Sequence, residues 1–137
     1  MSRKVARENV YKLVFEYLFY DELNQTSLEL MLLDSNLSED DKQYIIKVYE
    51  GVAANKDDLL QIIAKHSKGF AIDRIFRPDL AALLVATYEL KYMKDVPGPV
   101  AISEAVDLVK LYSTKKSYSF VNGVLASIYK EIQEENK

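Results

Sequence analysis

The stretch that decides the fold is PDLAALLVA, residues 78–86, in the middle of the chain. Pro78 suits the first turn of a helix, because its missing N–H would be unpaired there in any case. The residues from Leu80 to Ala86 are apolar on every side of such a helix. A helix without a polar face is buried nearly all round. The stretch therefore predicts a central helix that the rest of the chain surrounds.

On both sides of this stretch, apolar residues recur at helical spacing almost throughout, with no convincing strand alternation. The spacing predicts seven helices: about 3–20, 26–33, from 39, from 56 to about 67, from 78, from 99, and from 116 or 117. Residues 70–77 and 95–99 are predicted connectors. Short loops between so many helices predict an all-α fold, a compact helical bundle. The 137 residues are expected to form a single domain, 1–137.

Three of these helices have recognisable start signals. Ser38 with Asp41 three residues later is typical of an N-cap, and acids in the first turn favour the helix dipole. Thr26 with Glu29 resembles a capping box. Asn55 with Asp58 is a third start signal. In the sixth helix, the predicted core positions are Ile102, Ala105, Val106, Val109 and Tyr112.

The sequence offers little for catalysis. It has no cysteine, which excludes disulfides, thiolate zinc sites and cysteine nucleophiles, and His66 is its one histidine. The sequence contains enough Ser, His and Asp residues for a catalytic triad, but it has no nucleophile-elbow sequence. The acid pairs 40–41 and 57–58 suit metal or acid–base chemistry, yet helix starts explain them better. We expect a protein that is not an enzyme and binds no metal or cofactor.

No apolar run approaches the roughly 18 residues that a membrane helix needs. The basic N-terminal residues are not followed by an uninterrupted apolar segment, because Lys12 and Glu16 intervene. A signal peptide is therefore not expected, and a cytoplasmic location is. The formal net charge is −3, so any nucleic-acid site has to be a local basic patch.

One such patch is the start of the first helix, where Arg3, Lys4 and Arg7 occupy the first two turns. Cations there oppose the positive end of the helix dipole, at a cost of up to about 0.3–1 kcal/mol each. Arg3 and Arg7 also share a face and repel slightly. An anionic ligand would remove this conflict. A solvated basic helix tip is the alternative, and this feature alone favours that alternative.

The second patch is the start of the last helix. Phe120 lies at the edge of the apolar stripe, with Lys116 four residues earlier on the same flank and Lys115 before it. Lysines beside an aromatic ring are typical of a contact with single-stranded nucleic acid. Spacing fits equally well with Phe120 as a boundary core residue. Gly123 costs about 1 kcal/mol against alanine, which suggests close packing against a neighbouring helix.

Five blocks are spread over nearly the whole chain: ARE (6–8), YEL (88–90), DVP (95–97), VAISEAVDLVK (100–110) and FVNGVL (120–125). With these blocks, the chain resembles the NusB family of transcription antitermination factors. The last three blocks are highly specific in combination. The resemblance implies an all-helical fold of two small subdomains, without cofactor or catalysis.

The resemblance also implies partners. Such proteins bind boxA-type RNA in nascent transcripts, chiefly ribosomal RNA leaders. They pair with the small-subunit ribosomal protein NusE, which raises RNA affinity, and the pair joins other Nus factors on RNA polymerase to suppress termination. Self-association as a homodimer is a further option, which the sequence does not decide and which could cover the basic patch.

By position, the resemblance assigns the RNA surface to the starts of the first and last helices: Arg3, Lys4, Arg7, Lys115, Lys116, Ser117 and Phe120. It assigns the partner-protein surface to the connector into the central helix, where the acids would face a basic ribosomal protein: Asp73, Arg74, Arg77 and Asp79. The N-terminal basic cluster is shorter than in the most arginine-rich members. Lys116 stands where relatives can carry an acid, and should strengthen phosphate attraction.

Two other functions fit a helical chain of this kind. One is the RNA-binding appendage of an RNA cytosine methyltransferase, which resembles NusB. No segment of these 137 residues could bind S-adenosylmethionine, which disfavours that function. The other is a protein–protein adaptor without RNA contact. For the antitermination factor, we expect the two helix starts to bring their cations together into a single anion-binding surface.

Overall fold

The computed structural model describes residues 2–136, which form seven α-helices and one short 3-10 helix without any strand. The elements, in chain order, are α1 (Ser2–Tyr20), α2 (Gln25–Leu32), α3 (Glu39–Ala54), α4 (Lys56–His66), η1 (Ile72–Arg74), α5 (Arg77–Tyr92), α6 (Gly98–Tyr112) and α7 (Ser117–Glu135). The all-α prediction is confirmed. Within the described range, no helix combines the length and apolar character needed to cross a membrane.

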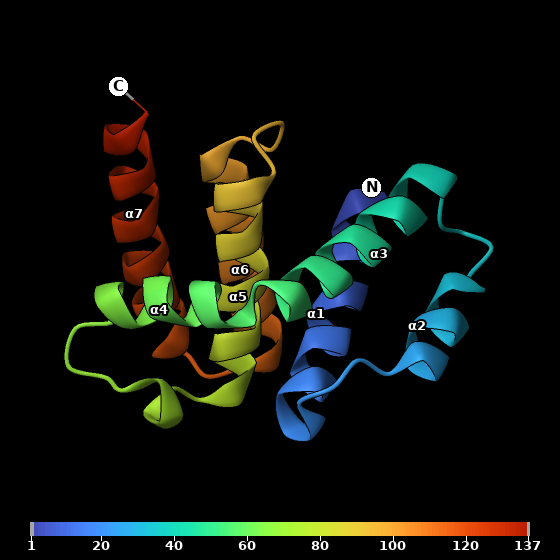
Figure 1. Ribbon diagram of the computed structural model, residues 1–137, viewed down its shortest axis with the longest axis horizontal. Coiled ribbons are helices and arrows are strands. Elements are labelled where there is room, and N and C mark those ends of the chain that lie inside the picture. The colour runs from blue at the N-terminus through green and yellow to red at the C-terminus, as the bar shows by residue number, and fades with distance from the viewer. Residues whose placement is uncertain (1, 137) are drawn as a thin grey trace.

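Helix α5 is the central element of the fold. Every residue from Asp79 to Leu90 is buried, as the apolar stretch predicted. Helices α1, α3, α4, α6 and α7 all pack against it, and α6 and α7 run beside it in the view of Figure 1. The chain reverses direction at each turn from α5 to α7, so that α7 begins near the start of α5.

The helices form two groups, as the resemblance implied. Figure 1 shows α1, α2 and α3 on one side and α4 to α7 on the other. Helix α1 packs against both α3 and α5, and therefore joins the two groups. The site residues of interest lie along this joint and at the lower end of the α5–α7 group in the same view.

The predicted helix starts are correct in part. The Ser38 Oγ accepts a hydrogen bond from the Asp41 N–H at 3.1 Å, which confirms that N-cap. The cap of α2 is Asn24 and not Thr26, because the Asn24 side chain accepts from the Ser27 N–H at 3.0 Å. Asn55 does not cap α4, since its side-chain amide donates to the carbonyl of Gly51 at 2.8 Å.

Helix α6 buries a slightly different face from the one predicted. Leu108 is buried, whereas Tyr112 is 41% exposed. The Tyr112 ring packs at the surface against Tyr11, with ring centroids 5.5 Å apart, and its hydroxyl donates to Glu8. Tyr112 therefore closes the edge of the α1–α6 contact and does not enter the core.

Candidate nucleic-acid interface

At the start of α1, Arg3 is held by the acidic first turn of α3. Its Nε donates to Asp41 at 3.0 Å, and its second guanidinium nitrogen donates to Asp40 at 2.7 Å. The guanidinium also lies 4.4 Å from the centroid of the Tyr44 ring. Asp40 and Asp41 suit the N-terminus of α3 and also neutralise Arg3. The fold itself therefore compensates the unfavourable position of this cation on α1.

Arg7 is buried, with 7% of its surface exposed. Its guanidinium donates to both carboxylate oxygens of Glu89 at 3.0–3.2 Å. The Tyr44 hydroxyl donates to the same carboxylate. Burial, together with the charge of Glu89, raises the pKa of Tyr44. The trio joins α1, α3 and α5, so that Arg7 acts inside the fold at the joint between the two groups.

Lys4 is the exposed member of the N-terminal cluster, with 61% of its side chain accessible. Its ammonium lies 3.3 Å from Asp107 and 3.5 Å from Glu104, both on α6. The hydrogen bond to Asp107 and the charge of Glu104 raise the pKa of Lys4. Exposed ion pairs of this kind are weak, typically about 0–1 kcal/mol, so a phosphate can compete for the ammonium.

At the start of α7, a buried carboxylate fixes the preceding turn. Asp79, in the first turn of α5, accepts a hydrogen bond from the Ser117 hydroxyl at 2.8 Å and from the Ser113 hydroxyl at 2.5 Å. Both Asp79 and Ser117 are buried. They therefore shape the α6–α7 turn from within, and each exposes only a small part of its surface.

This turn carries Lys115 and Lys116, which are both exposed. Neither lysine forms an ion pair with any acidic residue in the range 2–136. Their charges are consequently uncompensated at close range. This is the property that phosphate attraction requires.

Lys116 also lines a groove of about 400 Å³ between the connector and α7. The groove is lined by Phe70, Arg74, Ile75, Phe76, Asp79, Thr114, Lys116, Ser117 and Phe120. We call it the connector groove. The groove brings the two predicted surfaces together. Lys116 and Phe120 belong to the predicted RNA surface, and Arg74 and Asp79 belong to the predicted partner-protein surface.

Phe120 has features of both roles that spacing allowed. It is half-buried and packs against the core, yet it also lines the connector groove. Its ring meets Phe70 edge to face, with centroids 5.1 Å apart. Phe70 and Phe76 are 51% and 55% exposed, and sequence reasoning missed both. The available signal was two phenylalanines in a connector, where neither belongs to a helical apolar stripe.

The remaining connector residues are arranged around this groove. Asp73 and Arg74 are exposed on η1. Arg77, also exposed, places its guanidinium 4.6 Å from the ring centroid of Phe19, near the end of α1. The connector therefore offers an exposed mixture of aromatic, acidic and basic groups that extends towards α1.

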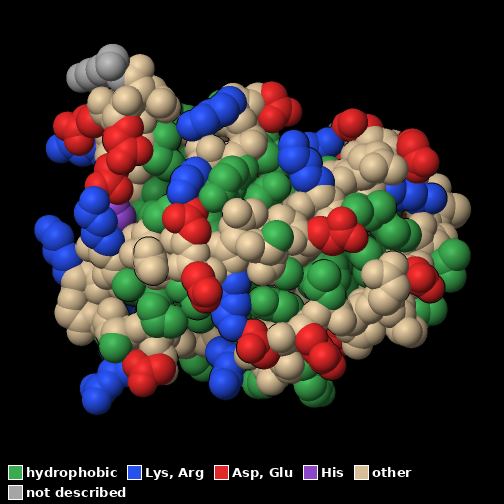
Figure 2. All heavy atoms as spheres, in the orientation of Figure 1, with side chains coloured by type: hydrophobic (Ala, Val, Ile, Leu, Met, Phe, Trp, Pro, Cys, Tyr) green, Lys and Arg blue, Asp and Glu red, His purple; other side chains and the backbone are tan. Residues whose placement is uncertain are grey.

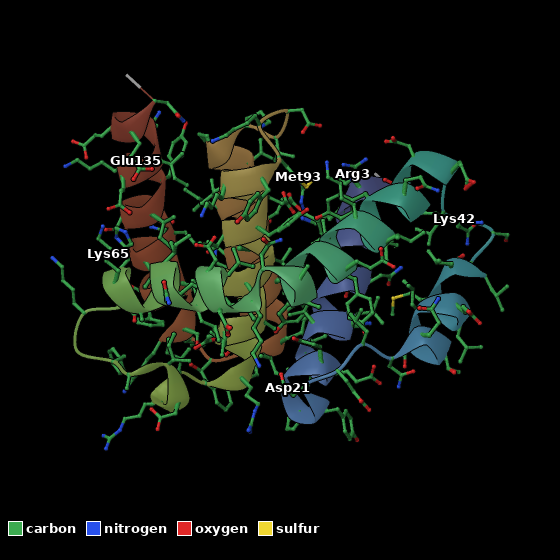
Figure 3. The ribbon with its side chains drawn as sticks, in the orientation of Figure 1. Arg3, Asp21, Lys42, Lys65, Met93 and Glu135 are labelled. Carbon is green, nitrogen blue, oxygen red and sulfur yellow. The ribbon has the colours of Figure 1, made fainter. Side chains whose placement is uncertain are left out.

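The two cation clusters do not converge, and that expectation is wrong. Arg7 contacts Glu89 and Ser117 contacts Asp79. These acids lie nearly three turns apart on α5, about 15 Å at a rise of about 1.5 Å per residue. In the view of Figure 3, Arg3 lies at the level of Met93, which follows the last residue of α5, and the connector leads into the opposite end of that helix. On the face in Figure 2, acidic and basic side chains are interspersed over the surface.

The family profile that matches this chain is that of the NusB family, over residues 3–130. The chain belongs to the NusB family. Among its relatives, the transcription antitermination protein NusB of Acetivibrio thermocellus is 38% identical over 130 residues, which cover 95% of this chain and 90% of that protein. The NusB of Listeria monocytogenes is 39% identical over 132 residues, which cover 96% and 98%.

Solved structures agree with this assignment. NusB of T. maritima superposes with a TM-score of 0.87 at 32% identity, covering 96% of this chain and 92% of that one. A chain from the crystal structure of the antitermination factors NusB and NusE in complex with dsRNA gives a TM-score of 0.84 at 28% identity, covering 95% and 97%. The predicted family and the predicted NusB-like fold are both confirmed.

The polar groups of this NusB chain that suggested chemistry have structural partners. Asp58 binds Lys91 at 2.5 Å and Tyr92 at 2.8 Å. His66 lies within hydrogen-bonding distance of Ser127 and Glu131, at 2.7 and 3.0 Å. Ser127 does not fit the role of a catalytic nucleophile, because it lies in the middle of α7. The backbone N–H groups around it form the hydrogen bonds of the helix and are not free to bind an oxyanion. In the part of the chain described, no three such acidic or histidine side chains gather to hold a metal.

Proposed function

We propose that this chain is a transcription antitermination factor that binds boxA-type RNA together with NusE and promotes ribosomal RNA transcription. Two observations support the assignment of class: relatives bear the name transcription antitermination protein NusB, and one similar chain was crystallised with NusE and dsRNA. The observation that carries the proposal is the exposed pair Lys115 and Lys116, which form no ion pair among the described residues; Lys116 also lines the connector groove together with Phe120.

The RNA contact in this proposal is centred on the start of α7. Lys115 and Lys116 attract phosphates, and the exposed part of the Phe120 ring stacks on a base. Lys4 adds a weaker phosphate contact farther along the surface, because Asp107 and Glu104 already compensate part of its charge. Arg3 and Arg7 support the site indirectly by stabilising the fold, and Ser117 orients the α6–α7 turn.

NusE, in the same proposal, contacts the connector side of the groove. Phe76 supplies apolar area, while Asp73, Arg74 and Arg77 supply charge at the rim. Asp79, which also lines the groove, holds the α6–α7 turn in place through Ser113 and Ser117. Because the connector groove borders both surfaces, each ligand can order residues that the other contacts. The protein acts in the cytoplasm in this role, without a catalytic step and without a cofactor.

The direct test is RNA binding measured with the ribosomal protein titrated in. A fluorescently labelled boxA-type RNA is mixed with the full chain at fixed salt, with and without NusE, and anisotropy gives the Kd. We expect tighter binding with NusE, and weaker binding of an RNA of the same composition in scrambled order. No binding of either RNA, with or without NusE, would support the adaptor function instead. Equal affinity for both RNAs would contradict the preference for boxA-type RNA.

A charge reversal examines the assigned surface. Lys116→Glu should weaken binding to every RNA sequence and flatten its salt dependence, because a phosphate contact is lost. The matched control is Lys42→Glu. Figure 3 shows Lys42 near the α2–α3 turn, on the opposite side of the molecule from α7. An unchanged salt slope for Lys116→Glu would remove this lysine from the RNA surface.

A further inference from the structure

Gly123, in the middle of α7, has no packing role. It is exposed, and a Cβ built at this position meets no atom within 4 Å. The close helix packing predicted for it from the sequence is therefore wrong. Two other glycines show the contrast: a Cβ on Gly51 would collide with Tyr88, and a Cβ on Gly98 with Tyr129. Folding does not require glycine at 123, where alanine would favour the helix.

The bare backbone at Gly123 forms part of the wall of a second pocket, of about 320 Å³. Its lining is mixed polar and apolar: His66, Lys68, Ser119, Phe120, Gly123, Val124 and Ser127. We call it the glycine pocket. Phe120 lines both this pocket and the connector groove. If one base of a single-stranded RNA stacks on Phe120, the neighbouring nucleotide can therefore reach the glycine pocket.

The polar groups of the glycine pocket suit a nucleotide. Lys68 is exposed and forms no ion pair with any acid among residues 2–136. The His66 ring is held in place by Ser127 and Glu131. Cations near the end of α4 also suit that helix dipole, which explains part of this cluster without a ligand. It does not explain an exposed glycine on the facing helix.

We propose that the glycine pocket is an RNA subsite, in which the nucleotide adjacent to the one on Phe120 lies against the α7 backbone at Gly123. Glycine is used where a ligand has to approach the backbone closely. In this arrangement, Lys68 attracts the phosphate and the Ser119 hydroxyl is available for a hydrogen bond. The His66 ring, whose two nitrogens already contact Ser127 and Glu131, forms part of the pocket wall. The inference rests on the proposed RNA-binding function and extends its contact surface along α7.

The test adds side chains at position 123. Gly123→Ala and Gly123→Leu both restore a good helix former at an open position, so the melting temperature should rise or stay unchanged. Binding of the labelled boxA-type RNA in the presence of NusE should weaken about threefold for alanine and at least about tenfold for leucine. Such opposite changes in stability and affinity are not expected of a residue with a structural role.

Asn122→Leu is the matched control. Asn122 is the neighbouring exposed residue of α7, but it lines a different groove, between α6 and α7. The same leucine placed there should leave the RNA Kd within about twofold of the wild type. A second pair of variants examines the phosphate: Lys68→Ala should lower the slope of log Kd against log salt by about 0.7, and Lys42→Ala should leave it unchanged.

The remaining outcomes separate the subsite from the proposed function. If the wild-type protein binds boxA-type RNA but Gly123→Leu binds it equally well, the subsite is overturned and the function stands. If the wild-type protein binds no RNA with NusE present, both are overturned. If Gly123→Leu weakens binding to NusE without RNA, the glycine pocket is a protein contact and the subsite is again overturned.

Discussion

The starts of α1 and α7 both carry clustered cations, but the fold treats them differently. At α1, Arg3 and Arg7 form ion pairs with acidic residues of α3 and α5. At α7, Lys115 and Lys116 stand on an exposed turn without acidic partners among the described residues. A basic cluster is therefore available to a ligand only where no other element supplies the opposite charge.

The largest expected effect is at the α1 side. Glu89→Ala leaves Arg7 buried without its carboxylate, and removing one partner of a buried ion pair costs about 3–5 kcal/mol. We expect a loss of this size in the free energy of unfolding, measured by urea denaturation. Lys116→Ala, the control on the α7 side, should change stability by less than about 0.5 kcal/mol. Equal small losses for both variants would contradict the contrast between the clusters.

A smaller effect is expected on RNA affinity at the α7 side. Phe120→Ala removes a stacking surface and should cost about 1–3 kcal/mol of RNA binding free energy. Tyr20→Ala, which removes an exposed aromatic ring at the end of α1, should leave the affinity unchanged. Because Phe120 also packs on Phe70, binding has to be expressed per folded molecule. A lower melting temperature with normal binding would make Phe120 a core residue only.

At the α1 side, the contact between Tyr44 and Glu89 should make the protein less stable at alkaline pH. Burial and the Glu89 charge raise the pKa of Tyr44 above its unfolded value of about 10. The native state thus holds this proton more tightly, and its contribution is complete below about pH 10 and lost as pH rises past that value. Tyr44 contributes about 1.4 kcal/mol per pH unit to this loss. Tyr11, whose pKa is also raised by burial, adds a contribution of its own. Tyr44→Phe should flatten this decline in urea denaturation at several pH values, whereas Tyr20→Phe should preserve it.

Much of the fold could be predicted because its signals are local. The apolar run from Leu80 to Ala86 indicates a buried helix in any arrangement, and Ser38 caps whatever helix follows it. The prediction for the start of α2 is wrong because Asn24 and Thr26 are both good caps. Asn24 is the one held in place by a distant residue, since its N–H donates to the Tyr49 hydroxyl at 2.8 Å. Tyr112 is exposed and packs on Tyr11 of α1, a contact between two helices that the spacing within α6 does not reveal.

The candidate site was predicted less well, because it depends on contacts between distant segments. Arg7 and Lys116 look equally available in the sequence, and only the position of Glu89 in space separates them. Asp79 and Ser117 were expected on two different surfaces, yet they bind each other inside the protein. Phe70 and Phe76 line the groove only because the connector lies beside α7, and the sequence does not show that contact. A glycine inside a predicted helix, as at Gly123, is visible in the sequence. Whether it allows close packing or leaves the backbone exposed depends on whether another helix covers it.

The most direct measurement compares the two clusters through the salt dependence of RNA binding, with NusE present. Lys115→Ala with Lys116→Ala should lower the slope of log Kd against log salt by about 1.4, since each lost contact with a single strand contributes about 0.7. Arg3→Ala with Lys4→Ala should lower it by no more than about 0.7, because only Lys4 is free to exchange its partners. A larger change for the α1 pair than for the α7 pair would contradict the account.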